Sequence, residues 1–142
     1  GPLITAKLIA LTSGIERLAK VSASTIQLLG AEKGLFRHLK DGSSPPKHGV
    51  IFQHPLLHAA PHWQRGKIAR VLSSKISIAV KIDFYNGEFQ GDHLEQELQS
   101  RIDDIRKRFP TKPKSAKGKS KSKKTTGKKG KKGKILVLVT LQ

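Results

Sequence analysis

Apolar residues recur at helical spacing in four stretches of the chain, and no stretch alternates as a half-buried strand does. In residues 3–21, Gly14 interrupts the apolar stripe, which predicts two short helices. Residues 25–40 predict one further helix, capped by Ser22 or Ser24. The first forty residues therefore predict three helices.

The longest predicted helix covers about residues 61–84, where apolar side chains recur at steps of three and four and Pro61 suits the first turn. Asn86-Gly87 is expected to end it. Asp92 and Glu95 then resemble a capping box, which predicts a last helix that Pro110 stops.

Residues 41–61 hold four of the seven prolines and predict a loop, from which Val50-Ile51-Phe52 inserts into the core. The pattern as a whole predicts an all-α, compact domain of four to five helices over residues 1–110. Residues 111–134 contain only Lys, Gly, Ser, Thr, Ala and Pro, which bury too little apolar surface to offset chain entropy. We therefore expect residues 111–142 to be a disordered basic tail with a short apolar end, to which no role is assigned.

The charge is concentrated at one end of the chain. The net charge is +18, of which residues 1–110 supply +6 (16 Lys and Arg against 10 acids) and residues 111–142 supply +12 (12 Lys and no acid). A terminal block of like charge is typical of an interaction arm. The lack of cysteine excludes disulfides and cysteine–zinc sites, and no apolar run is long enough to span a bilayer. Without an initiator Met or a signal peptide, we expect an intracellular piece of a longer protein.

Two rows of cations are predicted on helix faces. At about 100° per residue, a first set falls within an arc of about 80° on the 61–84 helix, with no acid among its members. It consists of Lys67, Arg70, Ser74, Ser77 and Lys81. Such a row can follow a phosphate backbone, although an ordinary solvated face remains open. Lys75 is a misfit, because its direction lies in the apolar arc.

The second row lies on the 25–40 helix and consists of Lys33, Arg37 and Lys40, which Lys20 extends. Gly30 and Gly34 flank this row one turn apart. Glycine within a helix costs about 1 kcal/mol relative to alanine, so two on one face indicate a close approach. That approach is either by a ligand or by a neighbouring helix of the domain.

The loop at Pro45-Pro46-Lys47-His48-Gly49 is the third candidate element. Two prolines lower the entropy cost of holding Lys47 and His48 outward, and Gly49 permits a close backbone approach. The histidine ring can stack on an unpaired base or bond to a phosphate, or it has no specific role.

Neither catalysis nor a bound metal is expected. His54, His58 and His62 recur every four residues, but prolines interrupt the segment and no zinc pattern supports it. No phosphate-binding glycine loop or nucleophile motif is present. We expect no catalytic residue, no metal and no cofactor.

Four segments carry a resemblance to a known family. They are Gly30-Ala-Glu-Lys33, Phe36-Arg-His-Leu39, Pro45-Pro-Lys-His-Gly-Val-Ile-Phe-Gln-His-Pro55 and Gln64-Arg-Gly-Lys-Ile-Ala-Arg70. In this order they resemble the Nop domain family over about residues 1–110, most closely its archaeal members, the core scaffolds of box C/D ribonucleoproteins. Eukaryotic nucleolar Nop proteins and a spliceosomal pre-mRNA-processing factor are related.

The resemblance implies a non-catalytic domain that recognises a kink-turn RNA stem together with its small, ribosomal-type kink-turn-binding protein. It also implies box C/D assembly for guided 2′-O-methylation of RNA, in the archaeal cytoplasm or the eukaryotic nucleolus. In the family, a fibrillarin-type methyltransferase binds through an N-terminal domain. We expect that domain and the family's coiled coil to be missing from this sequence, so that the methyltransferase would not bind here. A monomer without membrane contact is expected.

By motif match, Lys20 and His48 correspond to RNA-facing positions of the family, and the other motifs to further parts of its RNA and protein surface. The full expected RNA-binding set is Lys20, Lys33, Arg37, Lys40, Lys47, His48, Gln64, Arg65, Lys67, Arg70, Ser74 and Lys81. The expected partner-protein set is Gly30, Ala31, Glu32, Gln53 and His54. Gly34 departs from the family's usual alanine. Two other hypotheses remain: nonspecific nucleic-acid binding through the lysine-rich tail, and a protein–protein adaptor.

Overall fold

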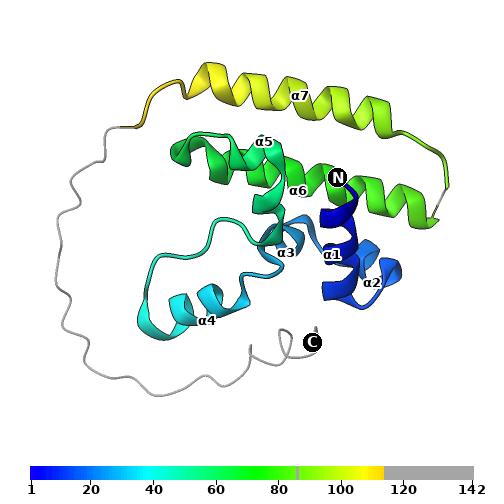
Figure 1. Cartoon of the computed structure of the whole chain (residues 1–142), viewed down its shortest axis with the longest axis horizontal. Helices are drawn as coiled ribbons and strands as arrows, with labels where there is room; N and C mark the ends of the chain where they lie inside the picture. Colours follow the sequence, from blue (N-terminus) through cyan, green and yellow to red (C-terminus); the bar gives the residue numbers. More distant parts are fainter. Residues whose placement is uncertain (86, 114–142) are drawn as a thin grey trace.

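A computed structural model describes residues 1–85 and 87–113, and every regular element in those residues is helical (Figure 1). The elements are α1 (Pro2–Thr12), α2 (Ile15–Lys20), α3 (Ala23–Leu28), α4 (Glu32–Asp41), the 3-10 helix η1 (Val50–Gln53), α5 (Pro55–His58), α6 (His62–Tyr85) and α7 (Gly91–Arg108). The prediction of an all-α domain is confirmed. The expected disordered tail lies outside the described residues.

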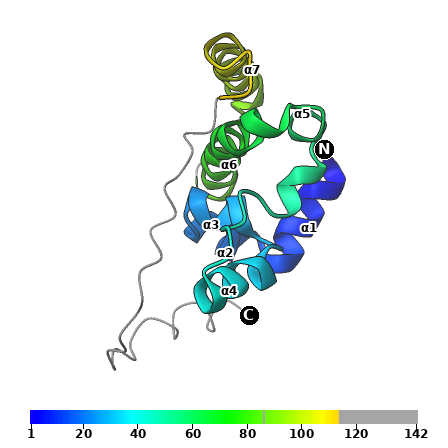
Figure 2. The same ribbon diagram turned by 90° about the vertical axis from the view of Figure 1, so that its left-hand side faces the viewer.

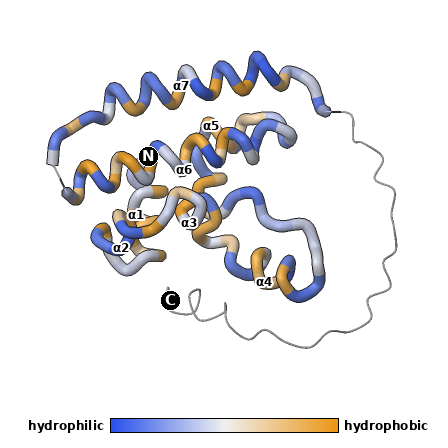
Figure 3. Tube along the Cα trace, turned by 180° about the vertical axis from the view of Figure 1, so that it is seen from behind, coloured by the Kyte–Doolittle hydropathy of each residue, from blue (hydrophilic) through white to orange (hydrophobic). Residues whose placement is uncertain are grey.

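The central element is α6, which packs on α2, α3, α5 and α7. Figures 1 and 2 show α7 along one side of α6 and α1–α3 on the other. Ile68 and Leu72 of α6 are buried, and Ile26 of α3 and Ile102 of α7 join them in the core. Apolar and polar positions are interspersed along α6 and α7 (Figure 3), and the neighbours on two sides of α6 bury more than one of its faces.

The predicted break at Gly14 is confirmed. Ser13 and Gly14 adopt φ angles of 61° and 136°, in the region that ends α1 and lets the chain enter α2. Ser22 is the cap of the next helix, since its side chain accepts a hydrogen bond from the Thr25 amide. The insertion of residues 50–52 into the core is also confirmed, because Ile51 is completely buried.

The prediction of one helix over residues 25–40 is wrong. The chain forms α3 and α4 instead, and Gly30 between them adopts φ 84°, so it does not lie in a helix. The cause is tertiary: the carbonyls of Gln27 and Leu29 accept hydrogen bonds from the amides of Gly49 and Val50 instead of continuing the helix. With this division, and with α5 inside the predicted loop, the described residues form seven α-helices rather than four or five.

The long helix and the last helix lie close to their expected bounds, and Gly87 with φ 69° follows the end of α6. The capping-box prediction is wrong: Gln90 is the cap of α7 and no side chain bonds to the helix start. Lys75, the misfit in the apolar arc, forms an ion pair with Glu97 of α7. Its position between two helices explains why a cation occurs there. Within the described chain, no helix combines the length and apolar character needed to cross a membrane.

Candidate nucleic-acid interface

The loop that carries Lys47 and His48 is fastened to the end of α3 by three hydrogen bonds. Gly49 N donates to Gln27 O (2.8 Å) and Val50 N donates to Leu29 O (2.7 Å). The side chain of Gln27 donates from Nε2 to Lys47 O (2.6 Å). The main chain on both sides of His48 is therefore fixed to a helix of the core.

Two glycines make this contact possible. A Cβ at Gly49 would lie 2.0 Å from Leu29 O, and a Cβ at Gly30 would lie 2.5 Å from Val50 Cγ2. At Gly49 the atom in the way is a backbone oxygen, so any side chain would force the two segments apart. At Gly30 the Val50 side chain would have to move, and the φ of 84° already disfavours other residues. The close approach that we expected at Gly30 is thus made by the chain's own loop.

The ring of His48 stacks on Phe52, with centroids 4.6 Å apart and planes inclined by 12°. The Arg65 guanidinium lies 5.2 Å from the same ring, and His58 packs beside it at 5.3 Å. Phe52 therefore serves as a common platform for the loop histidine and for a cation of α6. Aromatic packing of this kind restricts the rotation of the His48 ring.

Burial, followed by the positive charge of Arg65, lowers the pKa of His48 below its usual value. A neutral ring at physiological pH retains an acceptor nitrogen and suits stacking or hydrogen bonding better than ion pairing with phosphate. Among the loop residues, Lys47 consequently supplies the permanent charge.

Arg65 is held inward rather than free at the surface. Its Nε donates to Ala60 O (2.9 Å) and its Nη2 donates to His58 O (3.3 Å). Three of its five donors remain for other partners. Two residues further along α6, Lys67 Nζ lies 4.1 Å from the centroid of the Phe109 ring.

The predicted row on α6 is interrupted. Ser77 is buried, and the Ser74 hydroxyl donates to Arg70 O (2.9 Å) within the helix. Arg70 and Lys81 are exposed, but they lie three turns apart. Because Ser77 packs inward, a continuous basic line along α6 does not form, and the cations gather toward the start of the helix.

Gln64 is buried although we expected it on the RNA-binding surface. Only 4% of its surface is exposed, and its Nε2 donates to Phe109 O (2.8 Å). Its Oε1 is buried without a hydrogen-bond partner in the described residues. The end of α7 covers this side chain.

On α4, the predicted cations Lys33, Arg37 and Lys40 are all exposed, and no residue of the helix is buried. Phe36 and Leu39 are 43% and 65% exposed on the same helix. Within the described residues, no other helix packs extensively on α4. Its basic and apolar side chains are both available to a partner.

The expected partner-protein residues have local roles. Glu32 Oε1 accepts a hydrogen bond from Gly30 N (2.8 Å), which fixes the turn before α4 beside Ala31. Gln53 Oε1 accepts from Lys7 of α1 (2.7 Å). His54 Nδ1 accepts from Leu56 N (3.3 Å) at the start of α5, and burial lowers its pKa.

The fold brings some of the predicted residues together and leaves others apart. A Cβ at Gly66 would lie 3.5 Å from Lys47 Cδ, so the loop rests directly against the start of α6. Lys47, His48, Arg65 and Lys67 consequently share one region, which we call the loop–α6 surface. Lys20 lies elsewhere, on α2, and pairs with Glu16 (2.5 Å).

Sequence reasoning missed four residues that shape this region: Gln27, Phe52, Trp63 and Phe109. Their contacts join segments far apart in the chain, and no local pattern marks them. Phe52 was expected to insert into the core with Ile51, and it does pack against the core, but its contacts with His48 and Arg65 were not predicted.

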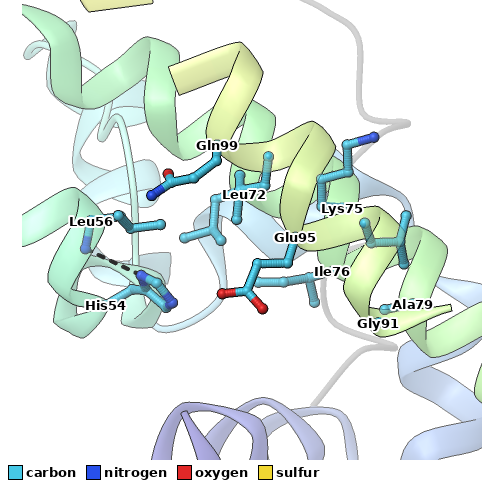
Figure 4. A pocket seen from close by; sticks show the side chains of 11 residues that line it. His54, Leu56, Leu72, Lys75, Ile76, Ala79, Gly91, Glu95 and Gln99 are labelled. Atoms are coloured by element: carbon cyan, nitrogen blue, oxygen red, sulfur yellow. Dashed lines mark hydrogen bonds between the residues drawn. The ribbon is translucent and has the colours of Figure 1, made fainter. Parts of the chain in front are cut away.

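A groove of about 390 Å³ lies between α6, α7 and α5, away from the loop (Figure 4). Leu72 and Ile76 of α6 and Leu98 of α7 line it, together with the side chains of His54 and Glu95. Among the described residues, no three His, Asp or Glu side chains are grouped to hold a metal ion. Apart from His54, the groove contains no predicted site residue.

A helical domain that presents a basic loop beside the basic start of a long helix is typical of nucleic-acid-binding modules. Residues 1–104 match the model of the Nop family, described as "snoRNA binding domain, fibrillarin". The chain therefore belongs to the Nop family.

Relatives from both archaea and eukaryotes are similar to this chain. An uncharacterised NOP5 family protein of Methanocaldococcus jannaschii is 53% identical over 110 residues, which are 78% of this chain and 26% of the relative. Nucleolar protein 58 of Botryotinia fuckeliana is 42% identical over 107 residues, 72% of this chain and 19% of its own length. Nucleolar protein 56 of Mus musculus is 39% identical over 105 residues, which are 72% of this chain and 18% of the relative.

The chain thus spans about a quarter of the archaeal relative and about a fifth of the nucleolar ones. The family description and the names of the relatives are those of RNA-associated and nucleolar proteins rather than of enzymes.

Proposed function

We propose that this chain is a non-catalytic RNA-binding scaffold domain of a box C/D ribonucleoprotein. It recognises a composite surface, formed by a kink-turn RNA stem and the small protein bound to the kink-turn. In the whole particle, this recognition supports guided 2′-O-methylation by a separate fibrillarin-type methyltransferase. Box C/D particles act inside the cell, where we place this domain.

The observation that carries the proposal is the anchoring of the loop in the loop–α6 surface. Hydrogen bonds of 2.6–2.8 Å fix the main chain before and after His48 to the end of α3, and the His48 ring stacks on Phe52. A contact whose geometry is set before binding loses little entropy when a ligand arrives. Such a surface favours one defined position on a structured RNA over general attraction to charge.

Helix α4 supports the composite part of the proposal. It combines three exposed cations with the exposed apolar side chains of Phe36 and Leu39, and no helix of the described chain covers it extensively. Phe36 and Leu39 are three residues apart and therefore neighbours on one side of α4, and a contiguous exposed apolar patch is typical of a protein contact. The RNA stem and the small protein would therefore be read by two neighbouring elements, the loop and α4.

The first test is a mobility-shift titration of the full chain on a kink-turn RNA at moderate salt, with and without the kink-turn-binding protein. We expect a specific complex only when both partners are present. Equal binding without the protein would contradict composite recognition.

Variants of the loop locate the contact. His48→Ala and Lys47→Ala should each weaken the ternary complex about tenfold, the loss of one well-placed contact of about 1.4 kcal/mol. His93→Ala and Lys107→Ala, both at exposed positions on α7, are the matched controls. Loop variants that behave like these controls would remove the loop from the interface.

The alternative is nonspecific binding by the tail, which the 12 lysines of residues 111–142 favour. The two functions differ in salt dependence, because each phosphate neutralised by a cation steepens the fall of affinity with salt. Arg70→Glu should weaken the ternary complex more than Lys117→Glu if a fixed surface reads the RNA. Equal effects would favour the tail.

A further inference from the structure

Two aromatic side chains are exposed at the end of α6, away from the loop–α6 surface. Tyr85 is 62% exposed and Phe84 is 38% exposed. Their ring centroids lie 4.8 Å apart with the planes inclined by 81°, which is an edge-to-face pair. In such a pair, each ring keeps at least one face that the other does not cover. Tyr85 therefore presents a ring face to solvent, and its contact with Phe84 restricts the rotation of the ring.

The side of α6 that carries Tyr85 also carries a cation and no acid. At about 100° per residue, Ile78, Lys81 and Tyr85 fall within an arc of about 60°. Ile78 is 42% exposed, and Lys81 is exposed as well. Asp83 is the only acid of α6, and its direction differs from that of Tyr85 by about 160°. An exposed ring on this side thus has an apolar and a cationic neighbour.

A second cation, Lys20, borders the ring from α2, which packs on α6 (Figure 1). The pKa of Lys20 is raised, first by its ion pair with Glu16 and to a smaller degree by Tyr85, so Lys20 and Tyr85 lie near one another. Both side chains of the ion pair are exposed, and such a pair exchanges readily for another anion. The two predicted RNA-binding cations far from the loop are therefore grouped around one ring. We call this group the Tyr85 surface; it consists of Lys20, Ile78, Lys81, Phe84 and Tyr85.

We propose that the Tyr85 surface binds unpaired nucleotides of the RNA, with a base stacked on Tyr85 and phosphates on Lys20 and Lys81. This inference rests on the proposed function, since the loop–α6 surface must hold the stem of that RNA. An aromatic ring beside cations suits single-stranded nucleic acid, because an unpaired base has a free face and a base within a stem does not. From Lys67 to Tyr85, α6 rises about 27 Å, so one RNA can extend from the loop to the Tyr85 surface.

The test compares RNAs that differ only in their unpaired nucleotides. The full chain is titrated onto kink-turn RNA that already carries the kink-turn-binding protein. The stem of the RNA is either blunt or extended at one or the other end by about ten unpaired uridines, a typical site length for single strands. We expect one of the extended RNAs to bind the chain about tenfold more tightly than the blunt RNA, as for one base stacked on an aromatic ring.

Substitutions at the Tyr85 surface separate base stacking from a general apolar contact. Tyr85→Phe keeps the ring and should retain the gain in affinity from the extension. Tyr85→Leu keeps an apolar side chain without a ring and should lose that gain. Lys81→Gln should reduce the gain about threefold and flatten its salt dependence, because one phosphate contact is lost. Arg101→Gln is the matched control for charge, at an exposed position of α7 on the side of α6 away from α2 (Figure 2). It should keep the full gain.

The outcomes distinguish a failure of this inference from a failure of the function on which it rests. If the blunt RNA binds and neither extension adds affinity, the Tyr85 surface is not an RNA site and the proposed function stands. A gain that persists in Tyr85→Leu, or that is lost in Tyr85→Phe, would overturn base stacking in the same way. If neither the blunt nor the extended RNAs form the ternary complex, both proposals are overturned.

Discussion

The 47–50 loop and α4 both carry predicted binding residues, and the fold treats them in opposite ways. The loop is bonded on both sides of His48 to α3 and packs on Phe52. Helix α4 buries no residue and, among the described residues, is not packed extensively on any other helix.

The difference separates two modes of recognition. A loop that is ordered before binding holds its contact groups in fixed positions, which suits an RNA whose shape is also fixed. An uncovered amphipathic helix contributes apolar area that is stabilised only when a partner buries it. Stability measurements distinguish the two regions, because loop substitutions should destabilise the free domain and α4 substitutions should not.

The largest loss of stability is expected for Gly49→Ala. The new Cβ would lie 2.0 Å from Leu29 O, so loop and α3 must separate. We expect the free energy of unfolding, measured by denaturant titration, to fall by about 1–3 kcal/mol, as for other overpacked sites. Gly66→Ala is the control: its Cβ meets only the flexible Lys47 side chain at 3.5 Å, and alanine favours the helix. Equal losses in both variants would refute a specific constraint at Gly49.

A smaller loss is expected for Gln27→Ala, which removes the donor to Lys47 O at 2.6 Å. One hydrogen bond contributes about 1 kcal/mol to the free energy of unfolding. Hydrogen exchange at the amides of Gly49 and Val50 should also accelerate as the loop loosens. Gln96→Ala, at an exposed position of α7, should leave both quantities unchanged. Unaltered exchange in the Gln27 variant would show that the loop does not depend on this bond.

The third effect is a dependence of stability on pH. Burial lowers the pKa of both His48 and His54, so protonation is easier in the unfolded chain. The contribution of the two neutral histidines to the free energy of unfolding is fully present above the ordinary histidine pKa of about 6.5. It is lost as the pH falls through the lowered pKa of the folded state. In thermal melts between about pH 7 and 5, the double variant His48→Gln, His54→Gln should show a flatter profile than the parent. A profile for the double variant that runs parallel to that of the parent would contradict the assignment.

The smallest change of stability is expected on α4. Leu39→Glu, at a position that is 65% exposed, should alter the free energy of unfolding by less than about 0.5 kcal/mol. It should nevertheless weaken the ternary complex about tenfold while leaving binding to RNA alone unchanged. Leu11→Glu, 41% exposed on α1, is the control and should assemble normally. Normal assembly of the Leu39 variant would exclude α4 as the protein contact.

The sequence predicted the elements whose cause is local. Gly14 and Ser22 set the first helix boundaries, and the three- and four-residue spacing of apolar side chains located α6 and α7. The basic character of the loop–α6 surface was also visible, because Lys47, Arg65 and Lys67 lie in two short motifs.

What the sequence did not predict depends on contacts between distant segments. The division of residues 25–40 follows from backbone hydrogen bonds to Gly49 and Val50, about 20 residues away. Ser77 and Gln64 are buried because α6 has packed neighbours on more than one side, whereas a single apolar stripe was assumed. Gly30 was interpreted as a contact site within a helix. It lies instead in a turn between α3 and α4, where the 47–50 loop packs against it.

The fluorescence of Trp63 should report on the contact between α6 and α7. Trp63 is the only tryptophan in the chain, and its indole nitrogen donates to Phe109 O across the α6–α7 junction. Indole emission depends on the hydrogen bonding and hydration of that nitrogen, so its fluorescence reports whether the end of α7 is docked. Departure of α7 would shift this signal while the helical circular dichroism of α1–α6 persists. A local opening is thereby distinguishable from global unfolding without any label.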